Sequence, residues 1–246
     1  MLGAIVLAAG QGKRLNCQNE NKVMLPLNGK PLVGYTYDLL KKININNIVV
    51  VVGFAKESVM DFFKNKVLYA IQEKAEGTGD AAWVGLQKMP PNADKVLIMY
   101  GDHSFFYTPQ MVEGLLDFQT KSNYPAVLIT VDRKDPFNYG RIIRNGKDTL
   151  SSIVEEKNAS EEQRKIKEIN PGFYLFETEF LKKYLPLIKR NPVSNEYYLT
   201  DIVEIAVSDG IKIGAYKVDN ENISVGVNTK EQLAEAEDLM RKIYAK

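Results

Sequence analysis

The chain has 246 residues and a mass of 27.8 kDa, a length that suits one large domain or two small ones. Its 32 Lys and Arg nearly balance its 31 Asp and Glu, and the formal net charge of +1 gives no support for general binding to nucleic acids or membrane surfaces. One cysteine and one histidine exclude an intramolecular disulfide, a cysteine-rich metal site and any site that needs two imidazoles.

Short apolar runs alternate with amphipathic segments through the first half of the chain. Each run is four to six residues long and nearly all apolar, which is typical of buried strands. The predicted strands comprise residues 3–8, 47–52, 67–71 and 95–100. The predicted helices between them comprise residues 31–43, 55–64 and 78–89. This alternation implies right-handed crossovers and a mainly parallel sheet.

The second half has strand-like segments separated by short polar stretches, which suggests hairpins or an added antiparallel portion. These segments comprise residues 126–131, 141–144, 150–155 and 169–176. Asn145 followed by Gly146 is a strong turn signal between two of them. A helix over residues 195–207, closed by Gly210, and a strand over residues 212–218 are predicted next.

The chain ends in a predicted amphipathic helix. Thr229 with Gln232 three residues on resembles a capping box. The apolar stripe of this helix comprises Leu233, Ala236, Met240 and Ile243. No apolar run approaches the roughly 20 residues that span a bilayer, and the N-terminus shows no signal-peptide pattern. We therefore expect one compact α/β domain in the cytoplasm, without a membrane partner.

The first predicted strand runs into Leu-Ala-Ala-Gly-Gln-Gly-Lys-Arg, residues 7–14. Small residues and two glycines at the carboxyl end of a parallel strand let the backbone approach a ligand and direct its N–H groups at phosphate oxygens. The spacing fits neither the dinucleotide-binding fingerprint nor the P-loop. Residues 7–14 are therefore either a phosphate-binding loop or an ordinary glycine turn with solvated basic residues. Lys22, soon after it, is either a second phosphate ligand or a surface charge.

These motifs resemble those of the sugar-1-phosphate nucleotidyltransferases. Leu-Ala-Ala-Gly-x-Gly-x-Arg, Lys-Val-x-Leu and Gly-Lys-Pro-Leu most resemble the uridylyltransferase half of the bifunctional bacterial enzymes that make UDP-N-acetylglucosamine. The similarity spans nearly the whole chain, because further motifs follow in the family's order. They lie at residues 72–79, 100–102, 139–142, 153–157, 168–172, 196–201 and 226–228.

The resemblance implies a fold and an activity. The fold is the nucleotide-diphospho-sugar transferase type, a Rossmann-like mixed, mainly parallel sheet flanked by helices, with a smaller antiparallel portion on the sugar side. The single domain would place the nucleotide in about residues 1–110 and the sugar in about residues 111–228, with a terminal helix over about residues 229–246. The activity is Mg²⁺-dependent transfer from UTP to a sugar-1-phosphate, most closely N-acetylglucosamine-1-phosphate, with release of pyrophosphate.

The same resemblance assigns nucleotide-binding residues. They are Leu7, Ala8, Ala9, Gly10, Gly12, Lys22, Gln72, Gly77 and Thr78. Arg14 and Lys22 would neutralise charge that develops on the phosphates and are the catalytic candidates. The side chain of Gln72 offers both a donor and an acceptor, which suits the edge of uracil. Gly77 and Thr78 also fit the start of a helix.

Two residues match the family's metal ligands. Asp102 follows a predicted strand and a glycine, and a carboxylate oxygen suits Mg²⁺, which takes few protein ligands. The alternative is a turn or cap aspartate. Asn228 would bind the same ion through its side-chain oxygen, although it lies where a helix cap is also expected.

A third set matches the family's sugar-binding positions. It comprises Tyr100, Gly101, Gly140, Glu155, Asn170, Tyr198 and Thr200. A carboxylate and an amide that converge on hydroxyl groups suit a pyranose. Alignment favours Glu155, and the alternative is its neighbour Glu156. Tyr198 and Thr200 also fit a helix start with an apolar face.

The chain departs from the family pattern at three points. His103 and Pro171 stand where the family has an apolar residue and a small hydroxyl residue, which bears on the identity of the sugar. His103 could coordinate, donate a hydrogen bond or be exposed. The hexapeptide repeats of an acetyltransferase domain are not seen, so we expect no acetyl transfer. The alternatives are another sugar phosphate such as glucose-1-phosphate, another base, or a non-catalytic nucleotide-sugar-binding protein. The sequence predicts no oligomeric state.

Overall fold

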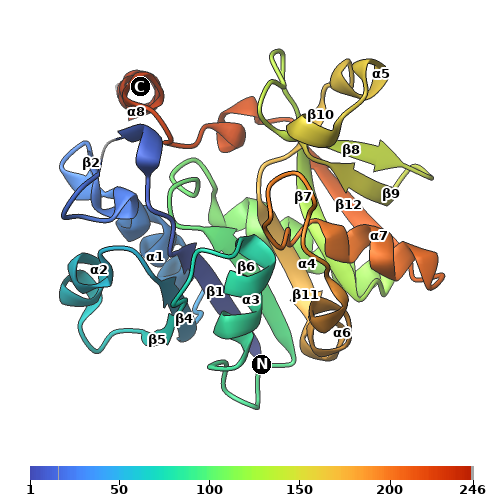
Figure 1. The fold of residues 1–246 in the computed structure, drawn as a ribbon, viewed down its shortest axis with the longest axis horizontal. Coiled ribbons are helices and arrows are strands. Elements are labelled where there is room, and N and C mark those ends of the chain that lie inside the picture. Colours follow the sequence, from blue (N-terminus) through green and yellow to red (C-terminus); the bar gives the residue numbers. More distant parts are fainter. Residues whose placement is uncertain (16, 245–246) are drawn as a thin grey trace.

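The computed structural model describes residues 1–15 and 17–244, in which a ten-stranded mixed sheet forms the centre of the molecule (Figure 1). The strand order is β10-β8-β9-β12-β7-β11-β6-β1-β4-β5. Four neighbouring strands from the first half run parallel: β1 (Leu2–Ala8), β4 (Asn47–Val52), β5 (Leu68–Ile71) and β6 (Lys95–Tyr100). Their bounds confirm the four strands predicted from the apolar runs.

The other strands form the second half of the sheet. They are β7 (Ala126–Asp132), β8 (Gly140–Arg144), β9 (Thr149–Val154), β10 (Glu168–Asn170), β11 (Phe173–Glu177) and β12 (Ile213–Val218). Among them β12 is parallel to β7, and the remaining pairs are antiparallel, including the β8–β9 hairpin whose connection contains Asn145 and Gly146. Strand β11 lies antiparallel between β6 and β7 and joins both halves into one sheet. The added antiparallel portion expected from the sequence is present.

Helices cover both faces of this sheet (Figure 1). The α-helices are α1 (Leu32–Lys42), α2 (Lys56–Phe63), α3 (Thr78–Leu86), α4 (Pro109–Ser122), α5 (Glu161–Arg164), α6 (Thr178–Tyr184), α7 (Asp201–Ser208) and α8 (Lys230–Tyr244). The 3₁₀ turns comprise Lys13–Leu15, Lys22–Met24, Glu156–Asn158, Leu185–Leu187 and Glu221–Ser224. A separate two-stranded hairpin comprises β2 (Pro26–Leu27) and β3 (Lys30–Pro31). No helix in the described part of the chain combines the length and apolar character needed to cross a membrane.

The core is divided by the sheet into two apolar layers. Alternate residues of β1 serve both, because successive side chains of a strand point to opposite faces. Ala4 and Val6 belong to the layer that contains residues of α1, α2, α4 and α8, whereas Ile5 and Leu7 belong to the layer that contains residues of α3, α6 and α7. The carboxyl ends of β1 and β6 therefore emerge between two packed layers, where their loops are held in place.

Two predicted elements had the wrong extent. The strand predicted over residues 169–176 is broken by Pro171, which has no N–H for a ladder, and by Gly172, whose φ is +85°. The helix predicted over residues 195–207 begins only at Asp201. Asn195 has a φ of +59°, and the Tyr197 N–H donates to the Glu76 carbonyl at 2.8 Å. The residues before Asp201 therefore bond to the loop that precedes α3 and are not helical.

Helices α4, α5 and α6 were not predicted. The signals for α4 are visible in retrospect, because Thr108 caps its first turn by accepting from the Met111 N–H, and Pro109 takes the first helical position. Asn123, in the left-handed conformation, ends it. Two predicted bounds also shift, since α3 ends at Leu86 and Pro31 precedes α1 rather than opening it.

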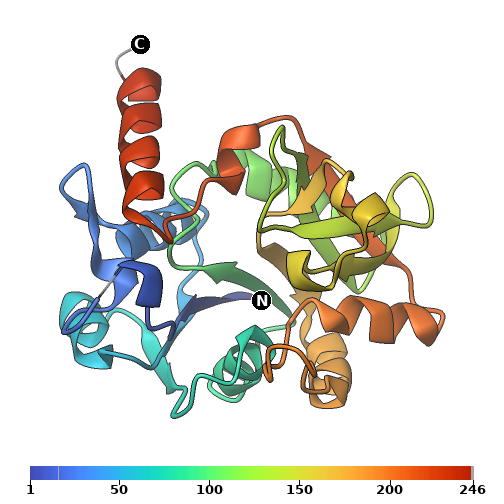
Figure 2. The ribbon, with the colours of Figure 1, turned by 45° about the horizontal axis from the view of Figure 1, so that its top comes forward.

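Figure 2 shows α8 projecting from the molecule beside the N-terminal hairpin. Thr229 accepts from the Gln232 N–H at 3.3 Å as predicted, whereas the Gln232 side chain accepts from Asn228, one residue before the expected partner. Ala236 and Met240 are buried. Ile243 is 43% exposed, so its place in the apolar stripe was predicted wrongly, because the last turns extend past the core.

Candidate active site

The buried side chain of Asn21 is hydrogen-bonded to the end of β1 and to the neighbouring loops. Asn21 was not predicted from the sequence. Its side chain is fully buried, and Nδ2 donates to the carbonyl oxygens of Ala8 at 2.9 Å and Phe54 at 2.8 Å. Its Oδ1 accepts from the Val23 N–H at 3.1 Å. Asn21 thus satisfies backbone groups from three segments. The available signal was an asparagine at the cap of a short helix.

Gly12 brings Lys22 against the loop after β1. Its φ of +62° is a conformation that side chains rarely adopt, and a Cβ at this position would lie 2.8 Å from Cβ of Lys22. Glycine is therefore required here for its backbone conformation and for its size. The consequence is that Lys22 lies beside the loop, as the phosphate-binding interpretation requires.

A cavity of about 420 Å³ opens beside the loop, and we call it the larger cavity. Its lining contains every predicted nucleotide-binding residue except Ala8, which is buried at the end of β1. The complete lining is Leu7, Ala9, Gly10, Gln11, Gly12, Lys22, Gln72, Ala75, Gly77, Thr78, Ala81, Tyr100, Asp102 and Glu196. Ala75, Ala81 and Glu196 were not predicted, and Gln11 was predicted only as part of the loop over residues 7–14.

Gln72 has a defined orientation in the larger cavity. Its Nε2 donates to the Gly77 carbonyl at 3.0 Å and to Oδ2 of Asp80 at 2.8 Å. Both amide hydrogens are therefore engaged, and Oε1 is the group that this side chain has left for a ligand. Gly77 and Thr78 also open α3, so the two interpretations of this motif are compatible.

A second, smaller cavity of about 170 Å³ gathers most of the predicted sugar-binding residues. Its lining is Arg14, Tyr100, His103, Asn138, Tyr139, Gly140, Glu155, Asn170, Pro171, Asn228 and Gln232. Within the described chain, Gly101, Tyr198 and Thr200 line neither cavity. Gly101 donates its N–H to the Leu7 carbonyl at 3.0 Å, and the Thr200 hydroxyl donates to Oε1 of Glu155 at 2.9 Å. Thr200 thus does not line the smaller cavity but is hydrogen-bonded to Glu155, which does.

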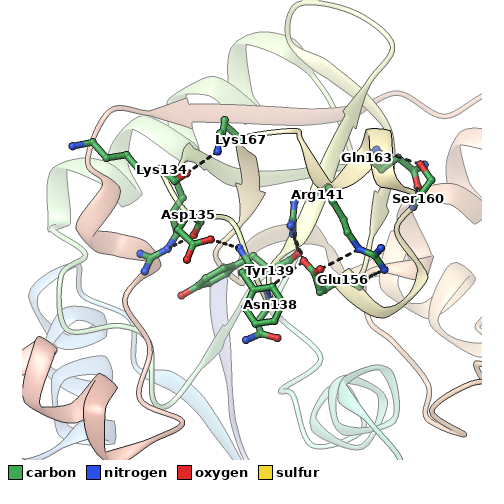
Figure 3. A network of polar contacts seen from close by, with 12 residues as sticks. Lys134, Asp135, Asn138, Tyr139, Arg141, Glu156, Ser160, Gln163 and Lys167 are labelled. Carbon is green, nitrogen blue, oxygen red and sulfur yellow. Dashed lines mark hydrogen bonds and ion pairs between the residues drawn. The ribbon is translucent and has the colours of Figure 1, made fainter.

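The neighbouring carboxylates Glu155 and Glu156 have different surroundings, and Figure 3 shows the contacts of Glu156. Glu155 lines the smaller cavity, and burial raises its pKa, although the Thr200 hydroxyl and the Arg141 charge oppose that rise. Glu156 instead pairs with the buried Arg141 at 2.6 Å and accepts from the Asn138 N–H at 3.3 Å. The first carboxylate is available to a ligand, and the second holds the surrounding loops together.

Tyr100 is the wall that the two cavities share. Its ring packs where a Cβ of Gly172 would stand, at 2.1 Å from ring carbon Cε2. Asn170, two residues earlier, donates to the Tyr174 hydroxyl at 2.6 Å and accepts from the Gly172 N–H at 3.0 Å. The turn at Pro171 therefore fixes the shared wall and the amide of the smaller cavity together.

Lys22, Asp102 and Asn228 meet at the junction of the cavities. The Lys22 ammonium pairs with Oδ2 of Asp102 and donates to Oδ1 of Asn228 at 2.9 Å. Burial alone would raise the pKa of Asp102, but Lys22 and His103 outweigh it and hold that pKa well below its usual range. Two oxygens that converge on one cation fit a divalent metal. Among the described residues no cluster of three or more His, Cys, Asp or Glu is placed to hold a metal ion.

A glycine loop at the carboxyl end of β1 and two cavities that meet at a cation position define an α/β nucleotide-binding domain. A family model described as the MobA-like NTP transferase domain matches residues 4–171. The chain belongs to this family. The resemblance to sugar-1-phosphate nucleotidyltransferases seen in the motifs is thereby confirmed at the level of the family.

Individual relatives agree with this placement. The chain is 38% identical over 240 residues to the bifunctional protein GlmU of Acetivibrio thermocellus, covering 98% of this chain and 52% of that protein. It is 39% identical over 241 residues to the GlmU of Thermoanaerobacter pseudethanolicus, with the same coverage. The chain therefore spans about half the length of these curated relatives.

A solved structure confirms the fold. A crystal structure of a UDP-glucose pyrophosphorylase complexed with UDP-glucose superimposes with a TM-score of 0.79 at 18% identity, covering 99% of this chain and 100% of that one. The expected mixed α/β sheet flanked by helices is confirmed.

Proposed function

We propose that the protein transfers a uridylyl group from UTP to a sugar-1-phosphate, N-acetylglucosamine-1-phosphate in particular, giving a UDP-sugar and pyrophosphate. The observation that carries the proposal is the meeting of two cavities at Lys22, Asp102 and Asn228. A triphosphate in the larger cavity and a sugar phosphate in the smaller one would bring their phosphates together at this junction. The family and the GlmU relatives support the same reaction.

Gln72 supports the choice of uracil. With both Nε2 hydrogens engaged by Gly77 and Asp80, its side chain offers an acceptor, and N3 of uracil carries a hydrogen to donate. N3 of cytosine is an acceptor and would face Oε1 without a proton between them. We therefore propose that UTP is used in preference to CTP.

The smaller cavity supports a sugar with several hydroxyl groups. Glu155 accepts hydrogen bonds from hydroxyls, and Asn170 has one Nδ2 hydrogen left after the bond to Tyr174. We place the nucleotide in about residues 1–110 and the sugar in about residues 111–228, with Tyr100 between them.

The reaction needs positioning and charge neutralisation more than proton transfer. An oxygen of the sugar phosphate attacks the α-phosphorus of UTP, and the bond from that phosphorus to the β-phosphate oxygen breaks as pyrophosphate leaves. The attacking oxygen is already ionised at neutral pH, so no general base is required. Arg14 lines the smaller cavity and Lys22 the junction, so both charges face the phosphates.

Asp102 and Asn228 would hold Mg²⁺, because their oxygens already converge on the Lys22 ammonium. A bound Mg²⁺ supplies Lewis-acid stabilisation of phosphate charge and a template for the reacting groups. In this assignment Lys22 moves from the two oxygens to a phosphate when substrate and metal enter.

The test is a pyrophosphate-release assay with Mg²⁺, in which several sugar-1-phosphates are combined with each of the four ribonucleoside triphosphates. We expect the highest rate with UTP and N-acetylglucosamine-1-phosphate, and no turnover by Asp102→Ala. The matched control is Asp132→Ala, which removes a 59%-exposed carboxylate of the surface pair with Lys217 and should retain full activity. Absence of pyrophosphate from every combination would refute the proposal. Calorimetric binding of a UDP-sugar by such an inactive protein would identify a non-catalytic binding protein instead.

A further inference from the structure

His103 follows Asp102 directly and lies between the two segments that carry the proposed metal ligands. Its Nδ1 is 3.2 Å from Oδ1 of Asp102, and its side chain is 15% exposed. An ionised carboxylate only accepts hydrogen bonds, so Nδ1 carries the hydrogen and donates it. The bond engages Oδ1, while Oδ2 of the same carboxylate faces Lys22. One oxygen is thus anchored and the other is presented to the cation.

The other edge of the imidazole packs against Gly226. A Cβ at Gly226 would lie 1.9 Å from Nε2 of His103 and 2.2 Å from Cε1. The φ of Gly226 lies outside the range that L side chains avoid, so the backbone does not require glycine there. The ring is the reason that residue 226 must lack a side chain.

This packing sets the position of Asn228. The Val227 N–H donates to the Asp102 carbonyl at 3.2 Å, so the segment carrying Gly226 and Asn228 is bonded to the segment carrying Asp102 and His103. The Tyr100 ring, whose centroid is 5.7 Å from that of the imidazole, packs on the histidine as well. The imidazole therefore fills the space between the two ligand-bearing segments.

We propose that His103 is a positioning residue for the cation site, orienting the Asp102 carboxylate through Nδ1 and spacing it from Asn228 by packing on Gly226. The inference rests on the proposed function, which supplies the metal. His103 acts through Asp102 and does not touch the ion.

The test measures metal binding in the absence of turnover. Mn²⁺ alone is titrated into each variant, and free Mn²⁺ is followed by electron paramagnetic resonance. We expect His103→Ala to weaken Mn²⁺ binding by roughly tenfold, as is usual when the partner that orients a metal ligand is removed. His103→Asn retains an amide donor and should recover most of this loss. Thermal melting of every variant confirms that it is folded.

Gly226→Ala tests the packing independently. In the unmodified background the added methyl group displaces the ring, and we expect a loss of Mn²⁺ affinity similar to that of His103→Ala. In the His103→Ala background the methyl group meets no ring, so Gly226→Ala should add less than a twofold loss. Equal effects of Gly226→Ala in both backgrounds would overturn the proposal, as would Mn²⁺ binding by His103→Ala at wild-type affinity.

The two proposals can fail separately. If Mn²⁺ binding shows the expected pattern but no combination of substrates releases pyrophosphate, the positioning role stands and the proposed reaction is wrong. If pyrophosphate is released and His103→Ala changes neither Mn²⁺ affinity nor the Mg²⁺ dependence of the rate, the reaction stands and the positioning role is wrong. A protein that does not bind Mn²⁺ saturably also contradicts the positioning role, because the carboxylate then has no cation to meet.

Discussion

Replacing Glu156 by glutamine removes the counter-charge of a buried guanidinium while nearly preserving the shape of the side chain. The Arg141 side chain is 2% exposed and the Glu156 side chain 16% exposed, and their closest nitrogen and oxygen are 2.6 Å apart. Arg141 would retain a hydrogen bond to the Tyr139 carbonyl but would lose its directly paired carboxylate. Leaving one charge of a buried pair unpaired costs about 3–5 kcal/mol, and we expect about 3 kcal/mol here because Gln can still accept a hydrogen bond.

The measurement is equilibrium unfolding in urea at pH 7, supported by thermal melting. For a chain of this length a loss of about 3 kcal/mol lowers the melting temperature by about 6–12 °C. Asp132→Asn is the control, because it neutralises a carboxylate paired with Lys217 at 2.8 Å but 59% exposed, and should change stability by less than about 1 kcal/mol. An equal effect of Glu156→Gln and Asp132→Asn would refute the reasoning.

Glu155→Gln, one position away, should behave in the opposite way. Burial raises the pKa of Glu155, so its charge is disfavoured in the folded state, and removing that charge should not lower stability at pH 7. The same substitution should lower turnover if Glu155 binds the sugar. Loss of stability in one variant and loss of activity in the other would separate the two neighbours.

Three further substitutions test other contacts. Burial, together with the charges of Glu155 and Glu204, raises the pKa of Asp201 to about 6 from its ordinary value of 3.8. The folded state therefore holds this proton more tightly, and stability should fall as the pH rises through this interval. Asp201→Asn should thus stabilise the protein at pH 7.5, by on the order of 1 kcal/mol after solvent screening, and not at pH 3, as measured by urea unfolding at both pH values. Asn21→Ala leaves buried carbonyls without their donor, each worth about 1–3 kcal/mol, so urea unfolding should show a loss of roughly 3 kcal/mol, and a loss under 1 kcal/mol would contradict this role. Gly172→Ala drives a methyl group into the Tyr100 ring, and we expect the KM for the sugar phosphate to rise at least tenfold, while an unchanged KM would show that this wall does not shape the site.

The sequence alone determined the parallel half of the fold. Its strands were predictable because each is a short apolar run, and for β1, β4 and β6 this local pattern reflects burial on both faces of the sheet. The strand over residues 169–176 was overextended because apolar residues lie on both sides of Pro171 and Gly172. In the structure both strands pair with β7, but the second partner of β10 is β8 and that of β11 is β6. The helix over residues 195–207 was also overextended. Its first predicted residues bond to the loop before α3, a contact between distant segments that the local pattern does not contain.

The site was predictable wherever motifs occur in the family's order, and it was not predictable where the contact joins distant segments. Sequence similarity selected Lys22, Asp102 and Asn228 one at a time. The Lys22 ammonium contacts side-chain oxygens of both Asp102 and Asn228 only in the folded chain, because residues 22 and 228 approach each other only when the sheet and α8 are packed. The role of Asn21 beneath the glycine loop and the contact of His103 with Gly226 were likewise decided by tertiary structure. Local periodicity reports which side chains are buried, whereas only the folded chain determines which distant atoms they meet.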